Sequence, residues 1–110
     1  MAVRPDETRP APPRPERLLE IIRFLATQSE TVVLTEHARG RMEERDILDV
    51  DLFRVLRTGR IVGRIAAGKG AGEWKCKVVS EIKGAREVGA VTVVQRERTL
   101  IVLTVEWEDE

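Results

Sequence analysis

The chain has 110 residues, of which 42% are hydrophobic and 35% are charged, with 19 basic and 19 acidic side chains. This size and composition predict one folded domain with a single core, and the zero net charge gives no sign of a general nucleic-acid binder. No apolar run approaches the length of a membrane span, so we expect a cytoplasmic protein without a membrane segment. One cysteine and one histidine exclude an internal disulfide and argue against a structural zinc site, and no cofactor is predicted.

The charges are unevenly distributed along the chain. Four of the last five residues are acidic: Glu106, Glu108, Asp109 and Glu110. Between residues 16 and 105 the basic side chains outnumber the acidic ones, 16 to 13. A net charge of about +3 over this stretch is compatible with a phosphate ligand but does not indicate one by itself.

Residues 1–15 contain all five prolines of the chain and predict a disordered or extended arm, followed by a folded domain over residues 16–110. Pro15 suits the first turn of a helix. Apolar residues at helical spacing, including Leu18, Ile22 and Phe24, predict that this helix continues to about Gln28.

A short β-rich run at residues 31–34 precedes a second predicted helix at residues 36–45. Thr35 is suited to cap this helix, with Ala38 and Met42 as its inward-facing residues. A third helix is predicted to start with Asp49 as its N-cap and to end at Gly59 in a left-handed conformation.

Beyond Gly59 the apolar pattern changes to period two or to continuous β-branched runs. Four strands are predicted, at residues 61–65, 74–82, 88–95 and 100–107. The short links between them favour an antiparallel meander. The predicted fold class is therefore α+β, with the N-terminal helices packed on one face of a four- to five-stranded antiparallel sheet.

His37, Arg41 and Arg45 recur every four residues along the second predicted helix. This spacing places them on one stripe of the helix, where an imidazole would lie beside two guanidinium groups. Histidine can accept or donate a proton at physiological pH, and arginine binds phosphate through paired hydrogen bonds. We therefore consider His37, Arg41 and Arg45 candidate catalytic residues for phosphodiester chemistry.

Lys75 and Lys77 alternate to one face of a predicted strand, and Arg86 lies near the neighbouring strand. If this cationic face meets the helix, these three residues are candidates for binding RNA phosphates. The structural alternative is that Arg41 and Arg45 pair with Glu44 on the surface, while the lysines protect a strand edge. Trp74 and Trp107 are expected to pack in or near the core, and Cys76 to be a small buried residue.

The runs TEHARGRMEERDI and DLFRVLRTGRI resemble the small bacterial domain family of unknown function 4258. Asp46 departs from the pattern, since the family usually has glycine there. The order of helices followed by strands is also similar to the RelE/ParE-like toxin superfamily, including MqsR-type toxins. This resemblance implies a RelE-like fold and a toxin that cuts messenger RNA or inhibits gyrase. It also implies a cognate antitoxin, a small zinc-finger or DNA-binding protein.

Two functions remain open from the sequence. The first is a toxin-like domain of a bacterial toxin–antitoxin system that binds RNA or acts as a metal-independent endoribonuclease. The second is a non-enzymatic interaction or regulatory domain of the same fold, in which the cations bind an acidic partner or stabilise the helix–sheet junction. The sequence does not predict the oligomeric state.

Overall fold

The structure is a computed structural model that describes residues 11–82 and 84–110. The prediction of an arm over residues 1–15 falls mostly on residues 1–10, which lie outside the described residues. The helices are α1 (Pro15–Leu25), a 3-10 helix η2 (Ser29–Thr31), α2 (Glu36–Glu44) and α3 (Asp49–Thr58). The strands are β1 (Val32–Leu34), β2 (Arg60–Ala67), β3 (Glu73–Ile82), β4 (Arg86–Gln95) and β5 (Thr99–Trp107).

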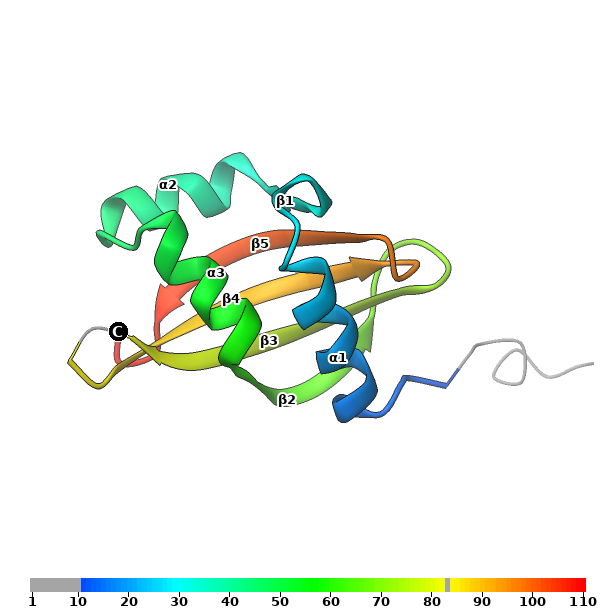
Figure 1. Cartoon of the computed structure of the whole chain (residues 1–110). Coiled ribbons are helices and arrows are strands. Elements are labelled where there is room, and N and C mark those ends of the chain that lie inside the picture. Colours follow the sequence, from blue (N-terminus) through cyan, green and yellow to red (C-terminus); the bar gives the residue numbers. More distant parts are fainter. Residues whose placement is uncertain (1–10, 83) are drawn as a thin grey trace, which may run out of the picture.

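The five strands form one mixed sheet in the order β1-β5-β4-β3-β2 (Figure 1). β2 to β5 form the predicted antiparallel meander. The expectation of a purely antiparallel sheet is wrong, because β1 pairs with β5 in parallel. The chain can make this parallel pair because α2, α3 and three strands separate β1 from β5 in sequence.

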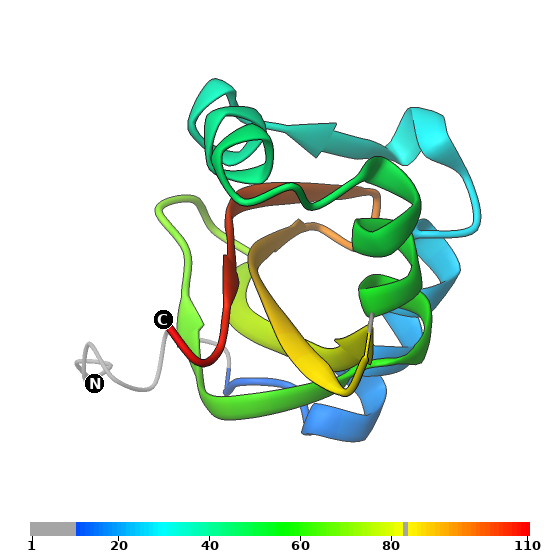
Figure 2. The ribbon, with the colours of Figure 1, turned by 90° about the vertical axis from the view of Figure 1, so that its left-hand side faces the viewer.

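The helices are distributed between one face and one edge of the sheet. Figure 2 shows α1 and α3 together on one side of the strongly curved sheet, while α2 lies along β5. We call the face under α1 and α3 the covered face and the opposite face the outer face. Thr35 lies between β1 and α2, and its backbone N–H donates to the Val102 carbonyl of β5. This hydrogen bond places the start of α2 beside β5.

The first helix is shorter than predicted and orients one aromatic residue differently. α1 ends at Leu25, and the hydroxyl of Thr31 donates to the Leu25 carbonyl at 2.6 Å. Phe24, predicted to lie in the apolar stripe, is 64% exposed, because the buried stripe follows residues 18, 21, 22 and 25. A residue one position before Leu25 is rotated about 100° around the helix, away from the sheet.

The caps of α2 and α3 confirm one prediction and correct another. Thr35 caps α2, since its hydroxyl accepts from the Ala38 backbone N–H. Asp46, which follows α2, adopts a left-handed φ of 55°. Asp49, however, is the first residue of α3 rather than its N-cap, which is Leu48; the carboxylate of Asp51 accepts from the Leu48 N–H.

Gly59 ends α3 as predicted, but its conformation is extended rather than left-handed, with φ −77° and ψ 179°. A Cβ atom at this position would lie 2.5 Å from the Val55 carbonyl oxygen and 2.7 Å from a Val78 methyl group. Gly59 is therefore required by the close approach of α3 to β3.

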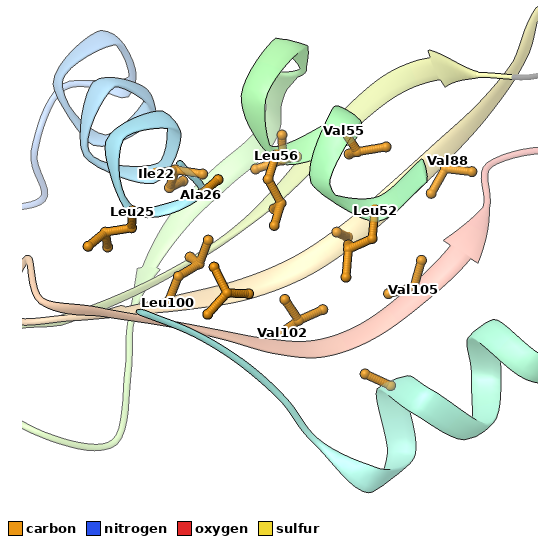
Figure 3. Packing of buried hydrophobic residues seen from close by; sticks show 14 of the residues in the cluster. Ile22, Leu25, Ala26, Leu52, Val55, Leu56, Val88, Leu100, Val102 and Val105 are labelled. Carbon is orange, nitrogen blue, oxygen red and sulfur yellow. The ribbon is translucent and has the colours of Figure 1, made fainter. Parts of the chain in front are cut away.

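The core lies between the covered face and the helices (Figure 3). Leu52 and Leu56 of α3 and Ile22 of α1 are fully buried against Leu100 and Val102 of β5. The predicted inward residues of the second helix and the predicted small buried cysteine are also buried: Ala38, Met42 and Cys76. Trp74 and Trp107 pack against the rim of this core, as expected.

Candidate anion-binding site on the outer face

The outer face carries the predicted lysines. Side chains alternate between the two faces of a strand. Lys75 and Lys77 of β3 therefore point to the outer face, while Cys76 and Val78 of the same strand are buried on the covered face. Lys75 is aligned with Val93 of β4, whose outward-facing side chain in turn is aligned with Ile101 of β5. This register gives the outer face a partly apolar floor with cationic side chains along β3.

The predicted stripe of α2 borders this outer face. Ala38 and Met42 are buried in the core, so positions 37, 41 and 45 lie on one flank of the helix. Arg39, on the other flank, lines a hollow at the α2–α3 loop. The flank with His37 and Arg41 therefore faces away from α3.

Arg45 is held by carboxylates. Its guanidinium donates to Glu110 and lies 3.3 Å from Glu44. The hydrogen bond to Glu110 raises the pKa of Arg45, and the charges of Glu44 and Glu106 act in the same direction. Arg41 also pairs with Glu44 at 3.3 Å, as the structural alternative anticipated.

Lys77 of the sheet pairs with two other acidic residues. Its ammonium group lies 2.6 Å from Glu108 and 3.3 Å from Glu106. The hydrogen bond to Glu108 raises the pKa of Lys77. Gly89 of β4 makes room for this ion pair, because a Cβ atom there would lie 2.5 Å from the Glu108 carboxylate and 2.6 Å from the Lys77 chain.

Arg86 is fixed by a carboxylate and by an aromatic ring. Its guanidinium makes two hydrogen bonds to Asp109, at 2.8 and 3.1 Å, and lies 3.9 Å from the centre of the Trp107 ring. The hydrogen bonds to Arg86 hold the pKa of Asp109 below its ordinary value. The indole N–H of Trp107 donates to the Arg45 carbonyl, so the ring connects Arg86 to α2.

The acidic residues at the end of the chain, Glu106, Glu108, Asp109 and Glu110, are called the acidic segment here. Three of the six predicted site residues form one ionic cluster with this segment. We call these three residues, Arg45, Lys77 and Arg86, the paired cations. Glu106 connects Lys77 with Arg45, because it pairs with the first and its charge raises the pKa of the second. Glu110 lies close enough to Arg86 for its charge to raise the pKa of that residue as well.

Of the other predicted residues, Arg41 shares Glu44 with Arg45, while His37 and Lys75 lie outside these contacts. His37 and Lys75 are exposed, and within the described part of the chain neither side chain makes a hydrogen bond or an ion pair. Lys75 lines a hollow of about 520 Å³ between the β2–β3 hairpin and the outer face, together with Lys69. The apolar wall of this hollow includes Ile101 and Leu103 of β5.

Sequence reasoning identified the cations but missed their partners. It treated the acidic residues after β5 only as an offset to the net charge, whereas they contact the predicted site directly. Their alternation with Trp107 at the end of a strand was the available signal, because neighbouring strand residues point to opposite faces.

Among residues 11–82 and 84–110, no group of three histidine, cysteine or acidic side chains is arranged to hold a metal ion. No helix in the same described ranges is both long and apolar enough to span a membrane.

The fold and the ionic cluster define a small α+β domain with a cationic helix flank beside the outer face of a mixed sheet. The family model described as domain of unknown function (DUF4258) matches residues 34–107, and the chain belongs to this family. No curated protein and no solved structure matches the chain. The family match includes all six predicted site residues, while residues 108–110 follow it.

Proposed function

We propose that this domain is the toxin of a bacterial toxin–antitoxin system and acts in the cytoplasm as a metal-independent RNA endonuclease of the RelE/MqsR kind. The observation that carries the proposal is that Arg45, on the same flank of α2 as His37, and Lys77 of the outer face share the charge of Glu106. An RNA strand along the boundary between this flank and the outer face would meet an exposed imidazole and several cations.

The chemistry requires a proton acceptor, a proton donor and cations at the phosphate. The ribose 2′-oxygen attacks the adjacent phosphorus as its proton leaves, and the bond from phosphorus to the 5′-oxygen breaks as that oxygen takes up a proton. The products are a 2′,3′-cyclic phosphate and a 5′-hydroxyl. His37 would perform one of the two proton transfers, with water performing the other.

Arg41 is the best-placed cation to stabilise charge on the phosphorane, because it follows His37 by one helical turn and is partly exposed. Lys75 would bind a neighbouring phosphate from the sheet, as an exposed cation on the outer face. Arg45, Lys77 and Arg86 would add to this surface when their carboxylate partners release them.

The proposed partner is an antitoxin, a small zinc-finger or DNA-binding protein. Its acidic side chains would compete with RNA for the exposed cations. A neighbouring gene encoding such a protein, with growth restored by its co-expression, is the expected genetic observation.

The decisive experiment is induced expression of wild-type, His37→Ala and Arg41→Ala chains in a bacterial host, with RNA cleavage assayed on the purified proteins in EDTA. We expect growth arrest by the wild type only. Cleavage should fall by at least about 100-fold for His37→Ala, the range for loss of a general acid or base. The melting temperature of this variant should stay that of the wild type, because His37 is exposed.

Arg39→Ala is the matched control, because Arg39 is an exposed arginine on the other flank of α2. It should cleave RNA like the wild type. Equal toxicity and cleavage by the wild type and His37→Ala would overturn the catalytic assignment. A wild-type chain that neither arrests growth nor cuts RNA would overturn the proposal of nuclease activity.

The ion pairs of Arg45 and Lys77 favour a second candidate, a non-enzymatic interaction domain in which these cations hold α2 against the sheet. In that case Arg45→Gln should lower the melting temperature, and His37→Ala should leave partner binding unchanged. The two candidates therefore differ in the role of His37, which is dispensable only in the second.

A further inference from the structure

We propose that the acidic segment is a built-in competitor for the phosphate-binding surface and must be displaced before a polyanion can occupy Arg45, Lys77 and Arg86. This inference concerns the regulation of the proposed RNA site and rests on that function for its biological meaning. The displacement itself is a property of charges and can be measured without RNA cleavage.

The first support is that each paired cation has its own carboxylate partner. Glu110 pairs with Arg45, and Glu108 pairs with Lys77 at 2.6 Å. Asp109 accepts two hydrogen bonds from Arg86. A carboxylate that accepts two hydrogen bonds from one guanidinium occupies the same donors that a phosphate would use. The segment therefore blocks the groups that would bind the nucleic-acid backbone.

The second support is that the backbone is shaped to hold the segment in place. The Glu108 N–H donates to the Glu87 carbonyl at 2.8 Å, as if β5 continued along β4. The chain then turns, and the Glu110 carboxylate accepts from the Trp107 backbone N–H at 2.8 Å. Gly89 leaves the space in which Glu108 meets Lys77.

The third support is the contrast with cations further along the outer face. Lys69 and Lys75 line the hollow beside the β2–β3 hairpin and are exposed. The segment thus covers the end of the face next to Trp107 and leaves the other end open. A polyanion could first bind the open lysines and then exchange with the carboxylates.

Exchange is physically accessible because the contacts lie at the surface. The side chains of Arg86 and Asp109 are 49% and 60% exposed. Exposed ion pairs are weak and screened by salt, whereas a polyanion gains from releasing its condensed counterions. A single phosphate would compete poorly, and several linked phosphates would compete well.

The test compares two triple variants with the wild type. Glu108→Gln/Asp109→Asn/Glu110→Gln removes the last three charges of the segment, leaves Glu106 in place, and keeps oxygen acceptors at all three positions. Glu16→Gln/Glu20→Gln/Glu30→Gln changes the net charge equally at exposed positions on α1 and η2. The probe is a fluorescein-labelled single-stranded oligouridylate, and its anisotropy gives Kd over a range of salt concentrations.

The triple variant of the acidic segment should bind the probe at least about 10-fold more tightly than the wild type at low salt. Its plot of log Kd against log salt should be steeper by at most about 2, because three cations lose their direct partners in the segment and each contributes about 0.7 for a single strand. Lys77 and Arg45 still keep their contacts with Glu106 and Glu44. The α1 control should change Kd by less than about 3-fold, as expected for long-range charge alone. Equal affinities of the two triple variants would overturn the proposal.

A single variant guards against a folding defect in the triple variant. Asp109→Asn frees only Arg86 and keeps the Glu110 contact with the Trp107 backbone. It should give a smaller gain in affinity in the same direction. A lower melting temperature without any gain in affinity would mean that the segment is only a structural clamp.

Cleavage measured in the same samples separates this inference from the proposed function. Tighter binding without cleavage would support the competitor and overturn the nuclease. Cleavage that depends on His37, with equal binding by both triple variants, would support the nuclease and overturn the competitor.

Discussion

The two faces of the sheet are stabilised by different interactions. On the covered face, Leu52, Leu100 and Val102 are fully buried among apolar neighbours. On the outer face Lys77, and at the start of β4 Arg86, make ion pairs with an acidic segment that contacts solvent. Apolar burial is strong and insensitive to salt, whereas exposed ion pairs are weak and exchangeable. The comparison indicates that the covered face provides stability and the outer face provides a surface that can change partners.

Replacement of a buried leucine should have the largest effect on stability. Leu52→Ala removes a fully buried side chain between α3 and β5 and should lower the free energy of unfolding by about 2–5 kcal/mol. Urea denaturation measures this change. Val50→Ala on the same helix is the control, because Val50 is 65% exposed and its replacement should change stability by less than about 0.5 kcal/mol. Similar losses for both variants would contradict the assignment of the core.

Two glycines provide a comparison of intermediate size. Gly59→Ala places a methyl group 2.5 Å from the Val55 carbonyl oxygen and should destabilise the protein by about 1–3 kcal/mol. Gly40→Ala, inside α2 with nothing within 4 Å of the new methyl group, should stabilise it by about 0.5–1 kcal/mol. Thermal melts measure both shifts. Opposite signs are required, and a stabilising Gly59→Ala would show that α3 does not approach β3 so closely.

The ionic cluster should make the smallest contribution to stability, and this contribution should depend on pH. Arg86 and Arg45 hold the pKa of Asp109 and Glu110 below their ordinary values of 3.8 and 4.5. These carboxylates are protonated more readily in the unfolded chain. Their stabilising contribution is therefore complete above the ordinary values and is lost as the pH falls toward the lowered ones.

Arg86→Gln should remove the part of this acid sensitivity that belongs to Asp109. Between about pH 7 and about pH 3, the urea midpoint of the variant should fall less than that of the wild type. Arg54→Gln, an exposed substitution on α3, should behave like the wild type. An equal fall for Arg86→Gln and the wild type would contradict the ion pair with Asp109.

Much of the local structure was predictable, because it depends on nearby residues. The Thr35 cap, the buried Ala38 and Met42, and the meander of β2 to β5 follow from capping chemistry and apolar periodicity. Phe24 and Gly59 were interpreted wrongly for a common reason. Their environments are set by neighbours distant in sequence, namely the sheet under α1 and the strand next to α3.

The candidate site likewise has features that local sequence predicts and features that only distant contacts set. The spacing of His37, Arg41 and Arg45 placed them on one flank of α2 from sequence alone, because helix geometry is local. Which charges face that flank depended on the parallel pairing of β1 with β5, which brings α2 beside the end of β5.

The sequence by itself determined the elements, the family pattern and the identity of the cations, since periodicity and side-chain chemistry act over a few residues. Only the tertiary structure decided that Arg45, Lys77 and Arg86 meet one acidic segment, while His37 and Lys75 stay exposed. Ion pairing requires charges within a few ångströms, and residues separated by 65 positions reach that distance only after the sheet is assembled.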